Sequence, residues 1–231
     1  MRKVGILGGM GPEATILLMK KIIECTKAQD DQDHIPLLVD NNTQVPSRIE
    51  AIINKNGSDP LPELCKMASS LEKNGASALA MPCNTAHLYI KEIRKQIKIP
   101  FISIVEESAA YLKKVQFGAK KIGILASPAV KITKIFEYEL EKNNMNLIYI
   151  GDETLILSTI KQIKSNFVSG PVSEKLEEIS IQAKSIQLDL ILIACSEFSI
   201  VSDEIKRKFN IPVVDTLDIL ASRIVNFSKK N

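Results

Sequence analysis

Two stretches of this 231-residue chain share one pattern: Lys3-Val4-Gly5-Ile6-Leu7 near the start and Lys121-Ile122-Gly123-Ile124-Leu125 near the middle. Each is a short apolar run of the kind that forms a buried β-strand. A second run, Leu79-Ala80-Met81-Pro82-Cys83, has a counterpart in Leu192-Ile193-Ala194-Cys195, and each cysteine is followed 17 positions later by the proline of an Ile-Pro pair. Three markers in the same order at near-equal spacing indicate an internal duplication.

Within each half, short apolar runs alternate with segments of helical periodicity, such as the stripe formed by Ile156, Ile160 and Ile163. This alternation predicts an α/β fold class: two similar three-layer α/β/α domains with mostly parallel sheets, related by a pseudo-twofold axis. We expect residues 1–100 plus 212–231 to form the first domain and residues 101–211 the second. The functional site is expected in the cleft between them.

The composition excludes several classes of protein. Apolar residues make up 45% of the chain and charged residues 25%, and the net charge is only +3. The lysines are scattered and no basic run is interleaved with aromatics, so nucleic acid is not an expected partner. No apolar run reaches membrane-spanning length, and the apolar run after Met1 is too short for a secretory signal. We therefore expect no membrane partner and a cytoplasmic location.

Four cysteines, Cys25, Cys65, Cys83 and Cys195, lack the close spacing of a zinc site, and the two histidines are far apart. No metal is therefore expected. Cys25 and Cys65 fall on apolar helical stripes and are interpreted as small buried hydrophobes. Cys83 and Cys195 instead follow apolar runs, where parallel sheets bind ligands. If the two halves face each other, these two thiols should meet across one cleft.

Two opposed thiols suit one class of chemistry. Inverting an amino-acid α-carbon needs a base on one face and an acid on the other, and a thiol has an unperturbed pKa of about 8.5, near enough to neutrality to serve as either. Taken singly, each of Cys83 and Cys195 is equally well interpreted as a buried cysteine before a helix cap. Their equivalent positions in duplicated halves favour the functional interpretation.

Two loops of the first half could bind ligand. The turn Gly8-Gly9-Met10-Gly11-Pro12 fits an anion site, a loose dinucleotide-binding pattern with Asp40 as ribose ligand, or simply a tight strand–helix turn. The matching turn of the second half, Ala126-Ser127-Pro128-Ala129, has no glycine. In the polar loop 40–48, Arg48 could hold a carboxylate or could be a solvated arginine. From pattern alone, Lys164 is a surface lysine.

Over nearly its whole length the sequence resembles the aspartate/glutamate racemase family. The resemblance is carried by Gly8-Gly9-Met10-Gly11-Pro12, Gln44-x-Pro46-x-Arg48, Met81-Pro82-Cys83-Asn84-Thr85-Ala86-His87 and Cys195-x-Glu197. It implies a homodimeric, pyridoxal-independent enzyme that needs no cofactor and uses Cys83 and Cys195 as opposed acid and base. It implies roles at the substrate for Met10, Gln44, Arg48, Asn84, Thr85, Lys164, Ser196 and Glu197, and it implies that Glu197 also tunes or orients the site of the second cysteine.

This chain departs from the family pattern at two positions. Ser196 stands where threonine commonly follows the second cysteine, and the hydroxyl is retained. Of two threonines common after the Lys121–Leu125 run, the first is replaced by Ser127, expected to contact substrate, and the second by Val130. The expected reaction is racemisation of a small acidic amino acid, aspartate before glutamate. Alternatives are a maleate or other small dicarboxylate isomerase, a nicotinamide-dependent dehydrogenase, and a non-catalytic protein that binds acidic ligands.

Overall fold

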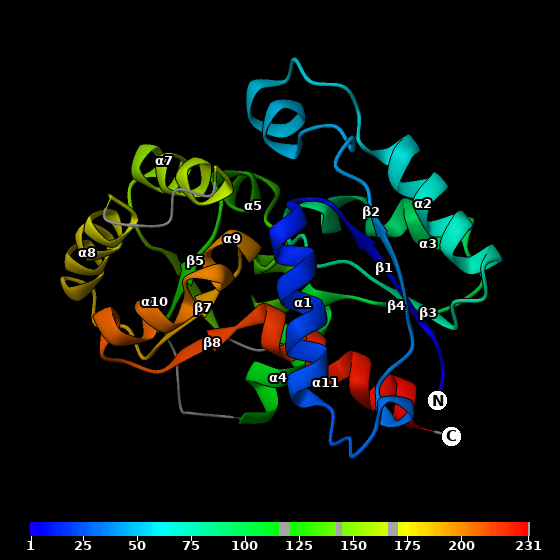
Figure 1. Ribbon diagram of the computed structural model, residues 1–231. Coiled ribbons are helices and arrows are strands. Elements are labelled where there is room, and N and C mark those ends of the chain that lie inside the picture. The colour runs from blue at the N-terminus through cyan, green and yellow to red at the C-terminus, as the bar shows by residue number, and fades with distance from the viewer. Residues whose placement is uncertain (116–120, 142–144, 166–170, 231) are drawn as a thin grey trace.

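The computed structural model describes residues 1–115, 121–141, 145–165 and 171–230 (Figure 1). Its strands form two separate sheets of four parallel strands each, in the orders β2-β1-β3-β4 and β6-β5-β7-β8. The strands are β1 (Val4–Gly8), β2 (Leu37–Asn41), β3 (Ala78–Ala80), β4 (Phe101–Ile102), β5 (Lys121–Leu125), β6 (Asn146–Tyr149), β7 (Leu190–Ile193) and β8 (Val213–Asp215).

The two sheets repeat one another strand for strand. Val4 of β1 pairs with Leu37 and Ala78, and its counterpart Ile122 of β5 pairs with Leu147 and Leu190. The same strand order and the same pairing in both sheets confirm the two parallel-sheet α/β units expected from the repeated strand sequence.

Helices cover both faces of each sheet. In the first half, α2 and α3 pack on the outer face, and in the second half α7, α8, α9 and α10 do so. The α-helices are α1 (Pro12–Cys25), α2 (Leu61–Lys73), α3 (Ile90–Gln96), α4 (Ile104–Val115), α5 (Pro128–Thr133), α6 (Glu137–Glu141), α7 (Glu153–Lys164), α8 (Pro171–Lys184), α9 (Ser196–Ile200), α10 (Ser202–Phe209) and α11 (Thr216–Lys229). Short helical segments η1 (Asp31–Asp33), η2 (Glu50–Asn54) and η3 (Thr85–Tyr89) complete the described elements.

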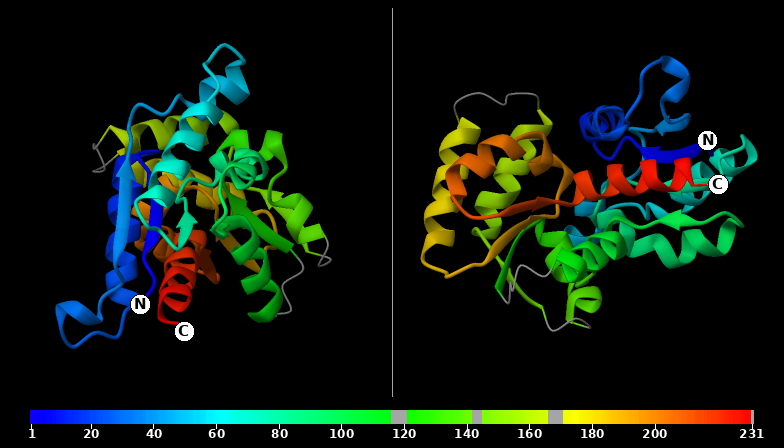
Figure 2. Two further views of the ribbon diagram at one scale, coloured as in Figure 1. Left: turned by 90° about the vertical axis from the view of Figure 1, so that its right-hand side faces the viewer. Right: turned by 90° about the horizontal axis from the view of Figure 1, so that it is seen from below.

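The inner faces of both sheets share one hydrophobic core with α1, α4 and α11. Val4 and Ile6 of β1 belong to this core together with Ile122 and Ile124 of β5, while Leu7 faces the outer core of the first half. The alternation follows from the two-residue period of a strand, which sends neighbouring side chains to opposite faces. The central core therefore joins the halves through packed side chains. In Figure 1, α1 lies between the two lobes, and the red C-terminal helix runs from the second half back along the first (Figure 2).

Sheet membership divides the chain differently from the expected boundaries. Phe101–Ile102 pairs with β3 in the first sheet, although residues 101–211 were expected to form the second domain. Val213–Asp215 pairs with β7 in the second sheet, although residues 212–231 were assigned to the first. The C-terminal helix α11 does return to the first half, where it packs on α1. Each Ile-Pro pair thus directly precedes the last strand of its own sheet. That strand, β4 or β8, pairs with the strand that precedes the cysteine, β3 or β7.

Two cysteines occupy less buried positions than their helical stripes predict. Cys25 is exposed and Cys65 is half-buried, so the expectation that both are buried is wrong. Cys25 is the last residue of α1, where the apolar stripe runs past the edge of the core. Cys65 lies beside the outer core of the first half and is only partly covered by it.

Asp215 caps α11, as its place before the last helix predicts. Its Oδ1 accepts hydrogen bonds from the Leu217 backbone N–H at 2.9 Å and from Ser199 Oγ at 2.8 Å. Burial, together with the nearby Asp218 charge, raises the pKa of Asp215 to about 6, while Lys21 and these hydrogen bonds act in the opposite direction. An acid whose pKa is raised in the folded state holds its proton more tightly there than in the unfolded chain. Its ionisation therefore lowers the free energy of unfolding.

The Asp215→Asn variant tests this cost. Asparagine keeps the Oδ1 acceptor but cannot ionise. The stability contributed by protonated Asp215 is present below its unfolded pKa and is lost as pH rises through about 6. The unfolding free energy of the variant, relative to that of wild type, should rise by on the order of 2–3 kcal/mol between pH 4 and pH 7. Urea unfolding across that range measures the difference, and a constant difference would contradict the raised pKa.

Candidate active site

Most of the predicted site residues lie in the segments that directly follow the carboxyl ends of the strands. In a sheet of order 2-1-3-4 the connections from β1 and β3 leave toward opposite faces, and ligands bind at this switch point. Met10 follows β1 and Cys83 follows β3, while Ser127 follows β5 and Cys195 follows β7. Lys164 is the exception, since it stands in the last turn of α7.

Close packing requires glycine in the turn after β1. Gly9 has a φ of +86°, and a Cβ placed there would lie 2.2 Å from the Asn42 carbonyl oxygen. The Gly9 N–H donates to Thr15 Oγ1 at 3.0 Å, which ties the turn to α1. Pro12 then begins α1 at a position where a missing N–H costs nothing. This turn brings backbone, rather than side chains, to the edge of the candidate site.

His87 holds the loop that carries Cys83. The backbone N–H of Ile104 donates to His87 Nε2 at 3.2 Å, so Nδ1 carries the ring proton and donates to the Cys83 carbonyl at 2.9 Å. Burial lowers the pKa of His87 to about 4, and the imidazole is therefore neutral near pH 7. This pair of hydrogen bonds fixes the backbone at Cys83 against the start of α4.

Cys195, Glu197 and Lys164 form a connected group in the second half. The Cys195 thiol donates to Glu197 Oε2 at 3.1 Å, and Glu197 Oε1 lies 3.2 Å from Lys164 Nζ. Ser196 Oγ also donates to Glu197 Oε2, at 3.5 Å. The Glu197 carboxylate is buried and its residue is 6% exposed, so these partners supply the contacts that water cannot.

This group perturbs two ionisable side chains. Burial, then the charge and the hydrogen bond of Glu197, raise the pKa of Cys195 well above its ordinary value. Burial lowers the pKa of Lys164, but Glu197, Cys195 and Cys83 together more than offset it, so the net shift is upward. A thiolate at either cysteine would therefore favour the ammonium form of Lys164.

An open cavity of about 890 Å³ lies between the two halves beside this group. The first half contributes the turn after β1, the start of α1 and the loop after β2, and the second half contributes Lys164, Glu197 and Ile200. The lining residues are Gly9, Gly11, Pro12, Glu13, Ala14, Ile16, Thr43, Val45, Ser47, Arg48, Lys164, Glu197 and Ile200. Cys83 and Cys195 are 7% and 6% exposed and do not line it.

Polar side chains on the loops after β3 and β5 meet across the halves. Thr85 Oγ1 and Ser127 Oγ are 3.2 Å apart. Asn84 Nδ2 donates to Thr216 Oγ1 at 3.4 Å, while Asn84 Oδ1 is buried and has no hydrogen-bond partner among the described residues. Val130 is fully buried in the central core. Its side chain has no polar atom, so this position gives the site no hydrogen-bond donor.

The remaining candidates are unequally placed. Arg48 lines the cavity and donates through Nη1 to the Val45 and Pro46 carbonyls at 3.2 and 2.7 Å. Its buried Nε has no hydrogen-bond partner in the part of the chain that the structure describes. Met10 is buried in the same outer core as Cys83. Gln44 is exposed, bonds Thr43 at 3.3 Å and does not line the cavity.

Sequence reasoning did not single out Glu13 or Ile200 as cavity residues. Glu13 carries a usable signal, since it follows the glycine turn in the first turn of α1. Ile200 carries none, because an apolar residue four positions into a short helix is typical of a core position.

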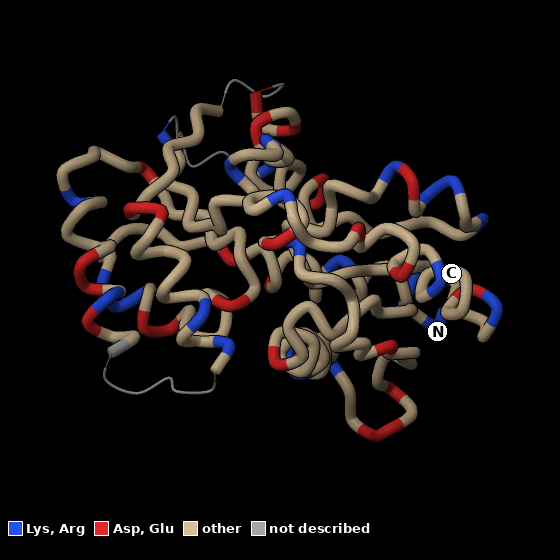
Figure 3. The backbone as a smooth tube through the Cα atoms, turned by 90° about the horizontal axis from the view of Figure 1, so that it is seen from above, with Lys and Arg blue, Asp and Glu red and all other residues tan. Residues whose placement is uncertain are grey.

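Charges of both signs are interspersed over the molecule (Figure 3).

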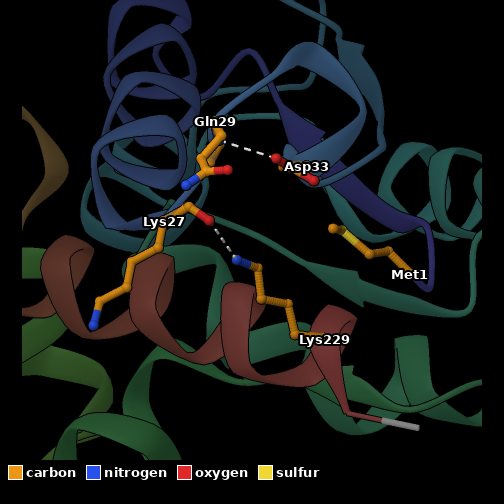
Figure 4. Close-up of a pocket in the computed structure, with 6 residues that line it drawn as sticks. Met1, Lys27, Gln29, Asp33 and Lys229 are labelled. Atoms are coloured by element: carbon orange, nitrogen blue, oxygen red, sulfur yellow. Dashed lines mark hydrogen bonds between the residues drawn. The ribbon is translucent and has the colours of Figure 1, made fainter.

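A second cavity of about 550 Å³ lies near both chain termini, where Lys229 Nζ donates to the Lys27 carbonyl at 3.3 Å (Figure 4). It contains none of the predicted site residues.

Among the described residues, no cluster of histidine, cysteine, aspartate or glutamate side chains has the arrangement to hold a metal ion. In the described part of the chain, no helix is long and apolar enough to cross a membrane.

Replacing His87 with asparagine should change how stability depends on pH. A base with a lowered folded pKa gives the folded state fewer bound protons, so wild type loses stability as pH falls from about 6.5 toward 4. This loss is on the order of 3 kcal/mol, and the variant lacks it. The advantage of wild type over His87→Asn should therefore shrink at acid pH in urea unfolding. An advantage that stays constant would show that His87 titrates normally.

Comparison with known proteins agrees with this geometry. The Asp/Glu/Hydantoin racemase family model matches residues 7–224. The broad specificity amino-acid racemase RacX of Bacillus subtilis (strain 168) is 30% identical over 232 residues, 96% of each chain. A Picrophilus torridus aspartate racemase structure matches with a TM-score of 0.88 at 29% identity, covering 100% of this chain and 96% of that one.

A Francisella tularensis glutamate racemase, solved in complex with D-glutamate, matches with a TM-score of 0.72 at 16% identity, over 98% of this chain and 80% of that one, and so shares the fold. The family match confirms the resemblance drawn from the sequence motifs. It also favours an isomerase over the nicotinamide-dependent dehydrogenase that the pattern of the glycine turn had left open. The chain belongs to the Asp/Glu/Hydantoin racemase family, and as a racemase it is an isomerase.

Proposed function

We propose that this protein interconverts the enantiomers of a small amino acid, aspartate first and glutamate second, with Cys83 and Cys195 as opposed acid and base and without a cofactor. One observation carries the proposal. The two thiols follow corresponding strands, β3 and β7, of duplicated sheets, and Cys195 is connected through Glu197 to Lys164 at the edge of a cavity between the halves.

The chemistry needs little beyond these two groups. One cysteine, as thiolate, takes the α-proton, and the other, as thiol, returns a proton to the opposite face of the carbon. Negative charge develops on the substrate carboxylate as the α-proton leaves, so hydrogen-bond donors near it lower the barrier. The Thr85 and Ser127 hydroxyls come from different halves and already contact one another, and they are suited to this role.

Two polar atoms without partners support ligand binding by this protein. Within the described part of the chain, Asn84 Oδ1 and Arg48 Nε are buried without hydrogen bonds, and buried polar atoms are rarely left so. One accepts and the other donates, as binding an amino acid requires. Asn84 immediately follows Cys83, and Arg48 lines the cavity.

Charge supports a substrate with a side-chain carboxylate. Arg48 and Lys164 are the cations that line the cavity, and Lys164 is already paired with Glu197. Arg48 is then the stronger candidate for the second carboxylate, since its donors form a planar fork. A wider range of amino acids is the second candidate function: the cavity of about 890 Å³ exceeds what aspartate fills, and RacX is named as broad in specificity.

A homodimeric state, a cytoplasmic location and the division into two domains with the active site between them remain part of the proposal. The exposed apolar residues Ile16 and Ile23 lie on one stripe of α1. A monomer–dimer measurement in solution addresses the first of these.

Removing either thiol should abolish turnover. Racemisation of L-aspartate in deuterated water, without added cofactor, should give D-aspartate that carries deuterium at the α-carbon, since the acid cysteine is exchanged with solvent. Cys83→Ala and Cys195→Ala should each reduce the rate by at least about 100-fold, the usual contribution of a positioned acid or base. Chiral chromatography with mass spectrometry measures both.

Cys65→Ala is the matched control, because Cys65 is a half-buried thiol on α2, outside the cavity. It should racemise at the wild-type rate. Undiminished α-exchange in both Cys83→Ala and Cys195→Ala would overturn the two-thiol mechanism. Ligand-induced thermal stabilisation without α-exchange would instead identify a binding protein.

Arg48→Gln should separate the substrate classes. A charge-assisted hydrogen bond to the side-chain carboxylate is worth about 1.5–3 kcal/mol, so kcat/KM for aspartate should fall by roughly 10- to 150-fold. Activity toward alanine, which lacks that carboxylate, should change much less. A panel that includes glutamate and maleate covers the alternatives. Equal losses for aspartate and alanine would mean that Arg48 does not read the side chain.

A further inference from the structure

The internal repeat extends to the residues that support the two cysteines. The alignment that places Cys83 on Cys195 also places His87 on Ser199, four positions after each cysteine. It also aligns the first residue of α4 with the first residue of α11. In each half, the side chain four positions after the cysteine is hydrogen-bonded to the start of that helix. Both cysteines are therefore supported in the same way, by different side chains.

In the first half the connection runs through the His87 ring. The segment η3 is a 3₁₀ turn, and the His87 backbone N–H donates to the Asn84 carbonyl at 3.0 Å, three positions back. The Cys83 carbonyl is therefore available to the ring, whose Nδ1–H donates to it at 2.9 Å. On the other side of the ring, Nε2 accepts from the Ile104 N–H at 3.2 Å. One side chain thus joins the Cys83 backbone to α4.

In the second half the connection runs through Ser199. The helix α9 begins directly after Cys195, and the Ser199 backbone N–H donates to the Cys195 carbonyl at 3.3 Å, as in an α-helix. The Ser199 hydroxyl is then available to donate to Asp215 Oδ1, at 2.8 Å. Asp215 also accepts from the Leu217 N–H and so caps α11. A serine and an aspartate thus join the Cys195 backbone to α11.

The two connections end on helices that pack against each other in the central core. Ile104 of α4 and Leu217 of α11 both belong to that core, and the two helices are in contact. His87, Ser199 and Asp215 are 4%, 2% and 2% exposed, so water does not take the place of these hydrogen bonds when one is lost. Each cysteine backbone is therefore tied to the part of the fold that both halves share.

We propose that His87 and Ser199 are positioning residues, each of which fixes one thiol. His87 holds Cys83 to α4, and Ser199, through Asp215, holds Cys195 to α11. The inference rests on the proposed function for its catalytic meaning. Neither side chain has to touch substrate, since each acts on the backbone of its cysteine. Loss of one connection should disturb proton transfer at one thiol and leave the transfer at the other in place.

Racemisation allows the two thiols to be tested separately. Under the proposed function, each enantiomer loses its α-hydrogen to one cysteine and receives a proton from the other. If one of these transfers is slowed, the primary deuterium isotope effect on kcat/KM rises for the enantiomer whose hydrogen is removed in the slowed step. It falls for the mirror image, whose hydrogen is removed in the other step. A general loss of stability would not move the two isotope effects in opposite directions.

His87→Asn and Ser199→Ala each cut one connection at its far end. Asparagine keeps a donor for the Cys83 carbonyl but lacks the Nε2 acceptor for the Ile104 N–H. Alanine keeps the backbone bond to the Cys195 carbonyl but lacks the hydroxyl. With α-deuterated L- and D-aspartate, the enantiomer whose isotope effect rises in one variant should be the one whose effect falls in the other. Each variant should lose roughly 2- to 12-fold in kcat/KM, the factor that one net hydrogen bond is worth.

Ser180→Ala is the matched control for Ser199→Ala. Ser180 is a fully buried serine of the second half, and its hydroxyl donates to the Glu177 carbonyl at 2.8 Å within α8, a helix that carries no cysteine. The control should keep the isotope effects of wild type for both enantiomers. Isotope effects in Ser199→Ala that match the control, or that change alike for both enantiomers, would overturn the inference.

Alkylation of the thiols by iodoacetamide is a second measurement, and it needs no substrate. Cys83 and Cys195 are buried, so each reacts when its own segment opens. His87→Asn should speed alkylation of Cys83 alone and Ser199→Ala that of Cys195 alone, by roughly the same 2- to 12-fold, as followed by mass spectrometry of the separated peptides. Equal acceleration at both thiols, or none, would contradict separate connections.

The two measurements distinguish failure of the inference from failure of the proposed function. Absence of racemisation in wild type counts against the proposed function and leaves the alkylation test intact. Racemisation in wild type without the opposed isotope effects counts against the inference alone. If His87→Asn does not fold, Ser199→Ala decides by itself, because its isotope effects must still move in opposite directions for the two enantiomers.

Discussion

The central core between the two sheets is the constraint on which the site depends. Val4 and Ile6 of one sheet, and Ile122 and Ile124 of the other, pack with α1, α4 and α11 in one continuous cluster. Apolar side chains in such a core are close-packed, so neither sheet can rotate freely against the other. The turn after β1 and the segment after β7 are thereby held at one cavity. The placement of both thiols follows from packing that lies away from them.

Within this frame the backbone repeats and the side chains do not. The turn after β1 needs Gly9, because the Asn42 backbone passes within 2.2 Å of any Cβ there, while the equivalent turn after β5 uses Ser127 and Pro128. The first arrangement brings backbone to the cavity, and the second brings a hydroxyl to Thr85. The duplicated fold provides two corresponding loops, and their different sequences present different groups. A reaction between mirror images needs two faces with opposite roles, and it does not need identical groups on them.

The sequence predicts what depends on short-range pattern. The repeated strands, the cysteines at their ends and the Asp215 cap all follow from local apolar runs and cap chemistry. The pairing of Lys164 with Glu197 does not, because it depends on how the last turn of α7 is rotated against α9, which packing across the second half determines. The same holds for β4 and β8: strands of two and three residues carry too little pattern to reveal their sheet. His87 also gives no sequence signal for its second partner, the Ile104 N–H.

The burial of both thiols bears on how substrate would reach them. Cys83 and Cys195 are 7% and 6% exposed, so each is shielded from bulk water and from nonspecific reaction. The Thr85–Ser127 hydroxyl contact joins the loops after β3 and β5. A carboxylate that accepts a hydrogen bond from each hydroxyl would exchange one neutral contact for two charge-assisted ones, which are roughly twice as strong. Under the proposed function, binding of the α-carboxylate would in this way separate the two hydroxyls, so that movement of the loop next to Cys83 is linked to recognition of the group next to the reacting carbon.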